Sequence, residues 1–161
     1  MFAKKFPLQQ GDLDSLCSIY AVINLLHSRG EIADFDAAVG KFQKLIDCIT
    51  AHPEGNVAGA VKAGVYRGDV PWFLEQLGRK VAKKNAPNVE DIVEGVKKGA
   101  IIFFKVLQGN FDHYTVLSPA STAARLELID SYGFDEILAS DGGWTLKGEP
   151  VEIKNLYVLA G

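Results

Sequence analysis

The hydrophobic pattern of this chain changes period close to residue 100. Before that point, apolar residues recur at helical spacing in the segments 16–28, 36–51 and 89–98. After it, β-rich runs separated by turn signals occupy 100–107, 114–118, 125–131 and 152–159. Helices first and strands afterwards predict an α+β fold, with an N-terminal helical half packed on a C-terminal antiparallel β-sheet. No repeat, low-complexity segment or linker interrupts the chain, so we expect a single domain over 1–161.

Two of the predicted helices carry start signals. Asp14 or Ser15 can cap the first helix, which runs to about Ser28. Asn88 can cap the helix over 89–98, with Asp91 placed to complete a capping box. The first helix is apolar on nearly every side, which predicts a buried central helix. Asn24 within it is expected to be a buried polar residue that bonds locally.

Cys17 lies in the first turn of that central helix, seven residues after Gln10. A thiol is a weak nucleophile at neutral pH until its thiolate is stabilised, and a helix N-terminus stabilises negative charge. A glutamine amide just upstream can donate an N–H to an oxyanion that forms beside the sulfur. This spacing therefore indicates nucleophilic catalysis, which also requires a histidine base.

One of the three histidines is placed to act as that base. His27 lies on the same helix as Cys17, about 15 Å further along its axis, which is too far. His52 ends the second helix and is expected to be exposed there. His113 opens a strand directly after the turn over 109–112, where it could meet a thiol carried by a helix.

The following strand supplies a group that could orient His113. If 119–124 connects a hairpin centred between Ser121 and Thr122, then His113 lies directly opposite Asp130. Opposite residues of an antiparallel pair share a face, with their Cβ atoms about 5 Å apart. The Asp130 carboxylate could then accept a hydrogen bond from the imidazole and hold one tautomer.

These motifs resemble the papain superfamily of cysteine peptidases, and most closely its compact bacterial branch related to bacteriocin-processing peptidases. The resemblance implies a papain-like fold, with Cys17 as the nucleophile, His113 as the base, Asp130 as its orienting group and Gln10 as the oxyanion-hole glutamine. The sequence departs from the family at two points. The gap between glutamine and cysteine is one residue longer than usual, so Gln9 is an alternative donor, and Ser18 follows the cysteine where glycine is frequent.

The predicted function is a thiol hydrolase or acyl-transfer enzyme that acts on an amide bond of a protein or peptide, with peptide hydrolysis as the default. Deamidation or transamidation of glutamine side chains requires the same triad and stays open. A non-catalytic papain-like binding module is the alternative from another class. A redox protein that pairs Cys17 with Cys48 is a third, although Cys48 is expected to be mostly buried and inert.

Composition narrows the partners and the compartment. The net charge of −3 gives no electrostatic argument for binding nucleic acid or an anionic membrane. Cys48 and His52 are spaced like metal ligands but lack further partners, so we expect no metal and no cofactor. The two cysteines and the lack of a signal-peptide pattern at the start favour a reducing, cytoplasmic location, with signal-less secretion left open. No pattern indicates the oligomeric state.

Overall fold

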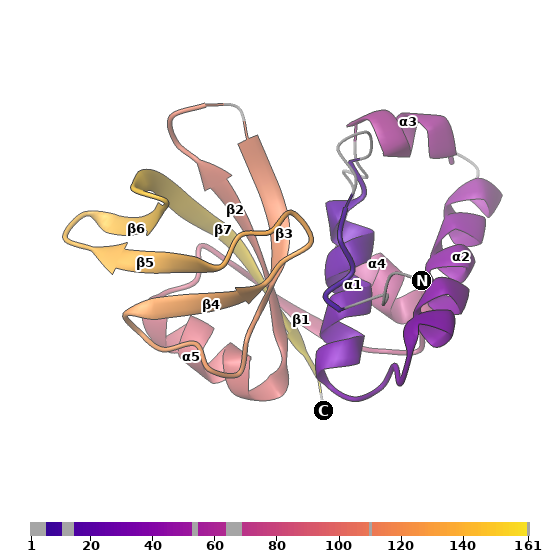
Figure 1. The fold of residues 1–161 in the computed structure, drawn as a ribbon, viewed down its shortest axis with the longest axis horizontal. Helices are drawn as coiled ribbons and strands as arrows, with labels where there is room; N and C mark the ends of the chain where they lie inside the picture. Colours follow the sequence, from indigo (N-terminus) through magenta and orange to yellow (C-terminus); the bar gives the residue numbers. More distant parts are fainter. Residues whose placement is uncertain (1–5, 11–14, 53–54, 64–68, 110, 161) are drawn as a thin grey trace, which may run out of the picture.

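The computed structural model describes residues 6–10, 15–52, 55–63, 69–109 and 111–160. The helices are α1 (Cys17–Ser28), α2 (Phe35–Ala51), α3 (Val57–Ala63), α4 (Asp69–Gln76) and α5 (Val89–Lys98). The strands are β1 (Val81–Asn85), β2 (Ala100–Val106), β3 (Phe111–Leu117), β4 (Arg125–Ile129), β5 (Glu136–Ser140), β6 (Gly143–Leu146) and β7 (Glu149–Leu159). Figure 1 shows the strands on one side and helices α1 to α4 on the other.

The strands form one antiparallel sheet that closes on itself. Their order is β1-β7-β2-β3-β4-β5-β6, and β6 also pairs with β7. Strands β2 to β7 therefore make a closed six-stranded barrel, to which β1 adds as an extra strand on β7. The length of β7 makes this closure possible, because Val151 near its start pairs with both Val106 and Trp144, whereas Leu159 at its end pairs with Val81.

The predicted papain-like α+β architecture, an N-terminal helical half packed on a C-terminal antiparallel β-sheet, was therefore wrong. The strands instead curl round until β6 pairs with β7, which closes the sheet into a barrel. Helices are also not confined to a separate half. Helix α5 contributes Ile92 and Val96 to the same apolar cluster as the inward-facing residues of the barrel.

Strand β2 separates the two apolar cores of the molecule. Its residues Ala100, Ile102 and Phe104 belong to the barrel cluster, whereas Ile101 belongs to the cluster formed with the helices. This division follows from the alternation of side chains along a strand. Because both faces of β2 are covered, the strand reads as an unbroken apolar run in the sequence.

Helix α5 closes the lower end of the barrel as drawn in Figure 1. Its predicted capping box is confirmed: the Asn88 side chain accepts from Asp91 N at 2.8 Å, and the Asp91 carboxylate accepts from Asn88 N at 3.0 Å. Gly95 lets the helix approach β7 closely. A Cβ at this position would lie 3.0 Å from the Val158 side chain and 3.3 Å from that of Leu156.

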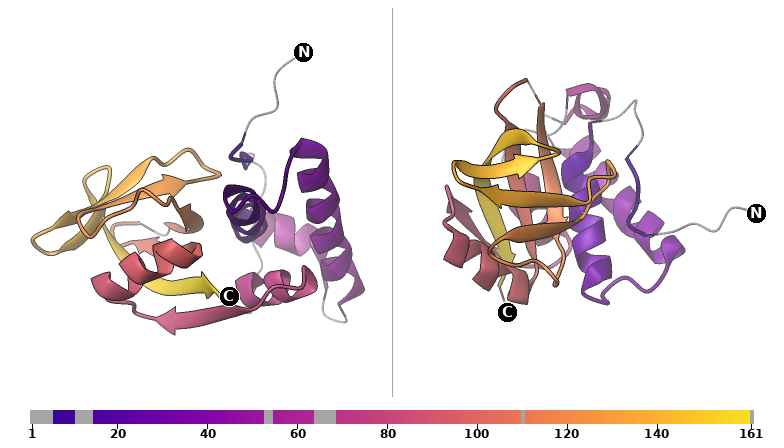
Figure 2. Two further views of the ribbon diagram at one scale, coloured as in Figure 1. Left: turned by 90° about the horizontal axis from the view of Figure 1, so that it is seen from below. Right: turned by 60° about the vertical axis from the view of Figure 1, so that its left-hand side comes forward.

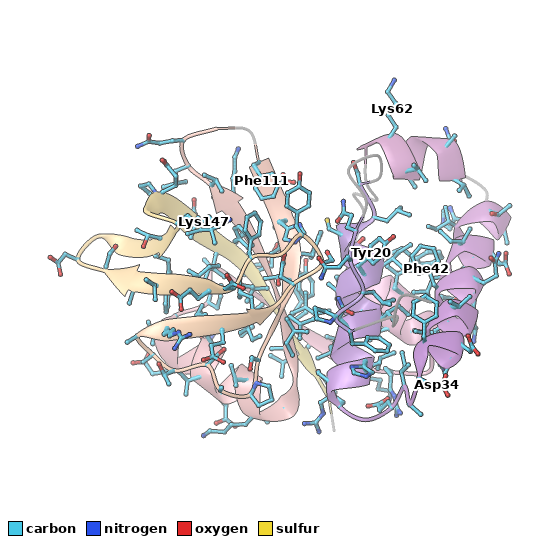
Figure 3. The ribbon with its side chains drawn as sticks, viewed as in Figure 1. Tyr20, Asp34, Phe42, Lys62, Phe111 and Lys147 are labelled. Atoms are coloured by element: carbon cyan, nitrogen blue, oxygen red, sulfur yellow. The ribbon has the colours of Figure 1, made fainter. Side chains whose placement is uncertain are left out.

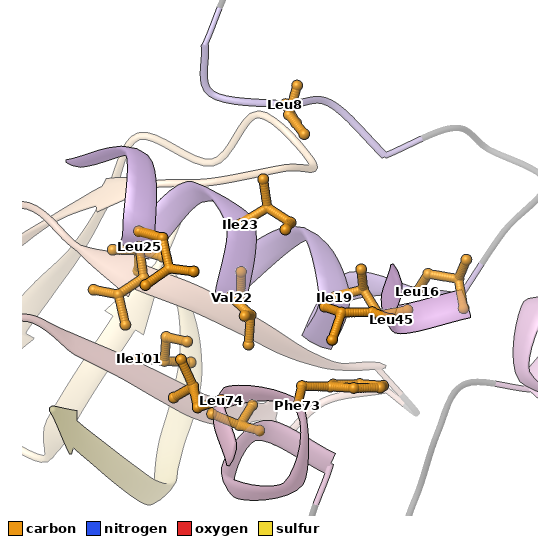
Figure 4. Packing of buried hydrophobic residues seen from close by; sticks show 14 of the residues in the cluster. Leu8, Leu16, Ile19, Val22, Ile23, Leu25, Leu45, Phe73, Leu74 and Ile101 are labelled. Carbon is orange, nitrogen blue, oxygen red and sulfur yellow. The ribbon is translucent and has the colours of Figure 1, made fainter. Parts of the chain in front are cut away.

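Helix α1 is buried between the barrel and the other helices, as predicted. The left panel of Figure 2 shows it almost end-on, with the strands on one side and α2 on the other. Figure 4 shows Val22 and Leu25 of α1 packed towards Ile101 of β2 and Leu74 of α4. None of the helices in the described part of the chain is long and apolar enough to cross a lipid bilayer.

The start of α1 differs from the prediction in its cap. Leu16 is the N-cap residue and makes no side-chain capping bond; its carbonyl accepts from the N–H groups of Ile19 and Tyr20. Ser15 instead bonds to α3, since its N–H donates to Val61 O at 2.8 Å and its hydroxyl donates to Lys62 O at 3.3 Å. Asp14, the other predicted cap, lies outside the described residues. Cys17 is thus the first residue of the helix.

Candidate active site

Cys17, His113 and Asp130 come together where the N-terminal end of α1 meets the barrel. Cys17 is half-buried at the start of α1, His113 lies on β3, and Asp130 directly follows β4. The His113 Nε2 donates to Asp130 Oδ2 at 2.8 Å. The Cys17 side chain hydrogen-bonds to the same imidazole. Because Nε2 is occupied by Asp130, we assign the sulfur to Nδ1.

The predicted proximity of His113 and Asp130 is confirmed, but the predicted strand register was wrong. The structure pairs Leu117 with Leu128 and Val116 with Ile129, which is shifted by two residues from the register that places His113 opposite Asp130. A shift of two residues leaves every side chain on its original face of the sheet. The two groups therefore still meet, along the diagonal between strands rather than directly across.

The loop that follows Asp130 holds its carboxylate in place. Oδ1 accepts hydrogen bonds from Tyr132 N at 2.7 Å and from Phe134 N at 3.2 Å, which leaves Oδ2 to His113. Burial raises the pKa of Asp130, but the hydrogen bond and charge of His113, with a further bond from Phe134 N, outweigh it and lower the pKa below its usual value. Asp130 is thus an ionised, fixed acceptor.

His113 is protonated at neutral pH in this setting. Burial lowers the pKa of its imidazole, but hydrogen bonds and charges from Asp130 and Cys17 outweigh burial and raise the pKa to about 9. The residue is 2% exposed and Asp130 is 3% exposed, so water scarcely competes for the hydrogen bond between them. An imidazolium beside the Cys17 sulfur is the arrangement in which a thiolate–imidazolium pair forms.

Four aromatic rings surround the imidazole and were not predicted to belong to the site. Ring centroids lie 5.8–6.1 Å from that of His113 for Phe104, Phe111, Tyr132 and Phe134. Figure 3 labels Phe111, which is the first residue of β3. A usable signal was present, because residues two apart on a strand share a face, and Phe111 stands two positions before His113.

Gln10 lies next to the residue that follows Asp130. Its backbone N–H donates to Ser131 O at 2.7 Å, and the residue is half-buried. Gln9, the alternative oxyanion donor, is exposed, and its Nε2 donates to Asp130 O at 3.3 Å and Pro7 O at 3.4 Å. The Gln9 amide is therefore committed to backbone carbonyls, which favours Gln10 of the two.

The other histidines lie away from the triad. The His27 ring stacks on Phe6, with centroids 3.4 Å apart. His52 is exposed at the end of α2, as predicted, with its ring edge-on to Trp72.

Cys48, the second cysteine of the chain, lies on α2. Cys48 is half-buried rather than mostly buried as predicted, and its Sγ lies 3.8 Å from Gln76 Oε1. Both Cys17 and Cys48 are free thiols, so no disulfide joins them. Among the residues that the structure describes, no three His, Cys, Asp or Glu side chains cluster in a way that could hold a metal ion.

Comparison with known proteins places the chain in no family. No family model matches the sequence, and no curated protein matches it at a significant level. The chemistry of this site therefore has to be inferred from the geometry of Cys17, His113, Asp130 and Gln10.

Proposed function

We propose that this protein is a thiol hydrolase or acyl-transfer enzyme that acts on an amide bond, with peptide hydrolysis as the default reaction. One observation supports this most strongly. A buried imidazole is bonded on one side to a fixed carboxylate, at 2.8 Å, and on the other to a half-buried thiol at a helix start. The three groups come from separate elements, so their junction is not a consequence of local sequence spacing.

In the proposed reaction, the Cys17 thiolate attacks the amide carbonyl carbon and the carbonyl oxygen becomes an oxyanion. The His113 imidazolium then gives its proton to the leaving nitrogen, the C–N bond breaks, and a thioester to Cys17 remains. The neutral imidazole next takes a proton from water as it attacks the thioester. The C–S bond breaks, which releases a carboxylic acid and restores the thiolate–imidazolium pair.

The oxyanion would be held by the Cys17 backbone N–H and the Gln10 side-chain amide. The first N–H groups of a helix lack partners within the helix and carry its positive dipole end. Preorganised donors of this kind stabilise the charge that develops in the transition state. Ser18, which follows the nucleophile where glycine is frequent in papain-like enzymes, is 1% exposed.

The location and the family stay predictions within this proposal. Two free thiols suit a reducing compartment, which supports the cytoplasm as the place where the enzyme works. The resemblance to papain-like cysteine peptidases rests on the residue motifs of the triad and not on the architecture. A protein or peptide is the expected substrate.

The proposal is tested with iodoacetamide, which needs no knowledge of the substrate. Labelling followed by mass spectrometry is measured between pH 5 and 9 on the wild type, on Cys17→Ala and on the matched control Cys48→Ala. We expect Cys17 to be alkylated well before Cys48 at pH 6.5, with the fast phase lost in Cys17→Ala and kept in Cys48→Ala. Equal labelling of both thiols, or faster labelling of Cys48, would overturn the proposal.

A further inference from the structure

A buried polar side chain, that of Asn24, lies among apolar residues in the middle of helix α1. Asn24 is 1% exposed and is surrounded by the apolar cluster that α1 forms with the other helices. Asparagine is a poor helix former, and a buried amide without partners is costly. The bonds that Asn24 makes must therefore account for its place in the helix.

Both ends of the Asn24 amide bind a single residue, Leu8. Leu8 N donates to Asn24 Oδ1 at 2.7 Å, and Asn24 Nδ2 donates to Leu8 O at 3.2 Å. These bonds span sixteen residues of sequence, so the expectation of a local bond was wrong. A side chain must offer both a donor and an acceptor to make this pair, as an amide does. We call residues 6–10 the N-terminal strap, which Asn24 fixes to α1.

The strap runs along α1 towards the end that carries Cys17. Figure 1 shows it beside the helix, and Figure 4 places Leu8 over Ile23, with Leu16 further along in the direction of the strap. Asn24 and Cys17 are seven residues apart, which is about 10 Å along the axis and nearly the same helix face. Gln10 is the second residue after Leu8 and the residue of the strap nearest in sequence to Cys17.

The far end of the strap is attached to the turn that contains Asp130. Gln10 N donates to Ser131 O at 2.7 Å, and the Gln9 amide donates to Asp130 O at 3.3 Å. The strap therefore connects the helix of the nucleophile with the strand end of the orienting carboxylate. Asn24 supplies the attachment at the helix end of this connection.

We infer that Asn24 is a positioning residue of the active site, which holds the strap so that Gln10 keeps a constant position relative to Cys17. This inference rests on the proposed function, since Gln10 acts there as an oxyanion donor. It implies that Asn24 affects steps in which an oxyanion forms. Direct alkylation of Cys17, which passes through no oxyanion, should be indifferent to it.

The test compares these two reactions in a Cys48→Ala background. Acylation by p-nitrophenyl acetate forms an oxyanion, and its rate is measured from the burst of nitrophenolate. Alkylation by iodoacetamide forms no oxyanion. We expect Gln10→Ala to slow acylation roughly 10²-fold. Asn24→Ala should slow it roughly 10-fold, and the double variant should be no slower than Gln10→Ala, because Asn24 acts through Gln10. Alkylation should stay within about twofold in all three.

A matched control separates positioning from general loosening of α1. Leu25→Val removes one buried methylene from the neighbouring position, which makes no bond to the strap, and should leave both reactions unchanged. If Asn24→Ala does not fold, the isosteric Asn24→Asp keeps the acceptor for Leu8 N and loses the donor to Leu8 O. It should then slow acylation and spare alkylation in the same way.

The outcomes separate this inference from the proposed function. Three results would overturn the positioning role while Cys17 remains the nucleophile. The first is a wild-type acylation rate in Asn24→Ala, and the second is a double variant that is acylated more slowly than Gln10→Ala. The third is a Gln10→Ala variant that is acylated as fast as the wild type. Equal slowing of acylation and alkylation would show a merely structural role and overturn it too. A wild type with no burst that depends on Cys17 would overturn the proposed function itself.

Discussion

On the barrel side of the candidate active site, His113 and Asp130 are almost fully withdrawn from solvent, whereas on the helical side Cys17 is half-buried at the start of α1. The barrel side is fixed by several bonds within a few residues, among them those from Tyr132 N and Phe134 N to Asp130. The helical side relies on bonds distant in sequence, from the strap and from Ser15 to α3. This difference indicates that, in the proposed reaction, the barrel sets the charge of the base His113, whereas helix α1 presents the Cys17 sulfur.

The covering of His113 is thin enough for so buried a group to take part in catalysis. Aromatic rings cover the imidazole, but Tyr132 among them is 48% exposed, so the layer over the base is one side chain thick. Substrate would reach the proton on His113 from the side of Cys17, where the hydrogen bond to the sulfur lies.

The largest expected effect comes from breaking the junction between the two sides. Cys17→Ala and His113→Ala should each lower turnover of an amide or activated ester by roughly 10⁴-fold or more, and the double variant should be no slower. The reason is that neither group works without the other. Turnover is measured by single-turnover kinetics, with His27→Ala as the histidine control. Additive losses in the double variant would show two independent contributions and contradict a shared mechanism.

A smaller effect is expected within the barrel side alone. Asp130→Ala should lower turnover by roughly 10²-fold, because His113 keeps its position part of the time without its acceptor. Without the carboxylate, the pKa of His113 should also fall from its present value of about 9. The titration of the His113 imidazole is measured by NMR. Glu127→Ala, which removes a carboxylate from β4, is the control. An unchanged histidine titration would remove Asp130 from its orienting role.

Local signals explain what could be predicted from the sequence. Asn88 and Asp91 stand at capping-box spacing, and the structure forms that box. Cys17 stands at the start of an apolar segment, and α1 begins there. His113 and Asp130 were found because a hairpin keeps residues of one face together even when its register is misjudged by two.

The rest depends on contacts that no local pattern encodes. Barrel closure requires β7 to pair with both β2 and β6, and the residues of β7 do not indicate which strands it pairs with. Strand β1 was not predicted, because its residues after Val81 are exposed and include a lysine pair, Lys83 and Lys84, which is untypical of strands. The register between β3 and β4 was misjudged because the connecting turn closes at Thr122 and Arg125, with Thr122 N donating to Arg125 O at 2.7 Å, nearer β4 than assumed.

The pH dependence of stability should reveal the raised pKa of His113 on the barrel side. The pKa of His113 is raised from 6.5 to about 9 in the folded protein, so its contribution is complete below pH 6.5 and is lost as pH rises towards 9. We expect the free energy of unfolding to fall across this window by roughly 3 kcal/mol at most. Urea unfolding at several pH values measures it. His113→Gln should abolish the fall and the control His52→Gln should keep it; a wild type equally stable at pH 6.5 and 9 would contradict the raised pKa.

The smallest expected effects come from two helix caps, one beside the barrel and one among the helices on the other side. Asn88 caps α5 at the barrel, and Asp34 caps α2, where its carboxylate accepts from Ala37 N at 2.8 Å. Replacing either by alanine removes one bond to a helix N-terminus and should lower the free energy of unfolding by about 1 kcal/mol. Neither cap touches the triad, so alkylation of Cys17 should keep the wild-type rate in both variants. Urea unfolding and iodoacetamide labelling are measured on the same samples. A slower alkylation in Asn88→Ala alone would mean that loosening α5 disturbs His113, and the local bonds around Asp130 would then not be enough to fix the barrel side.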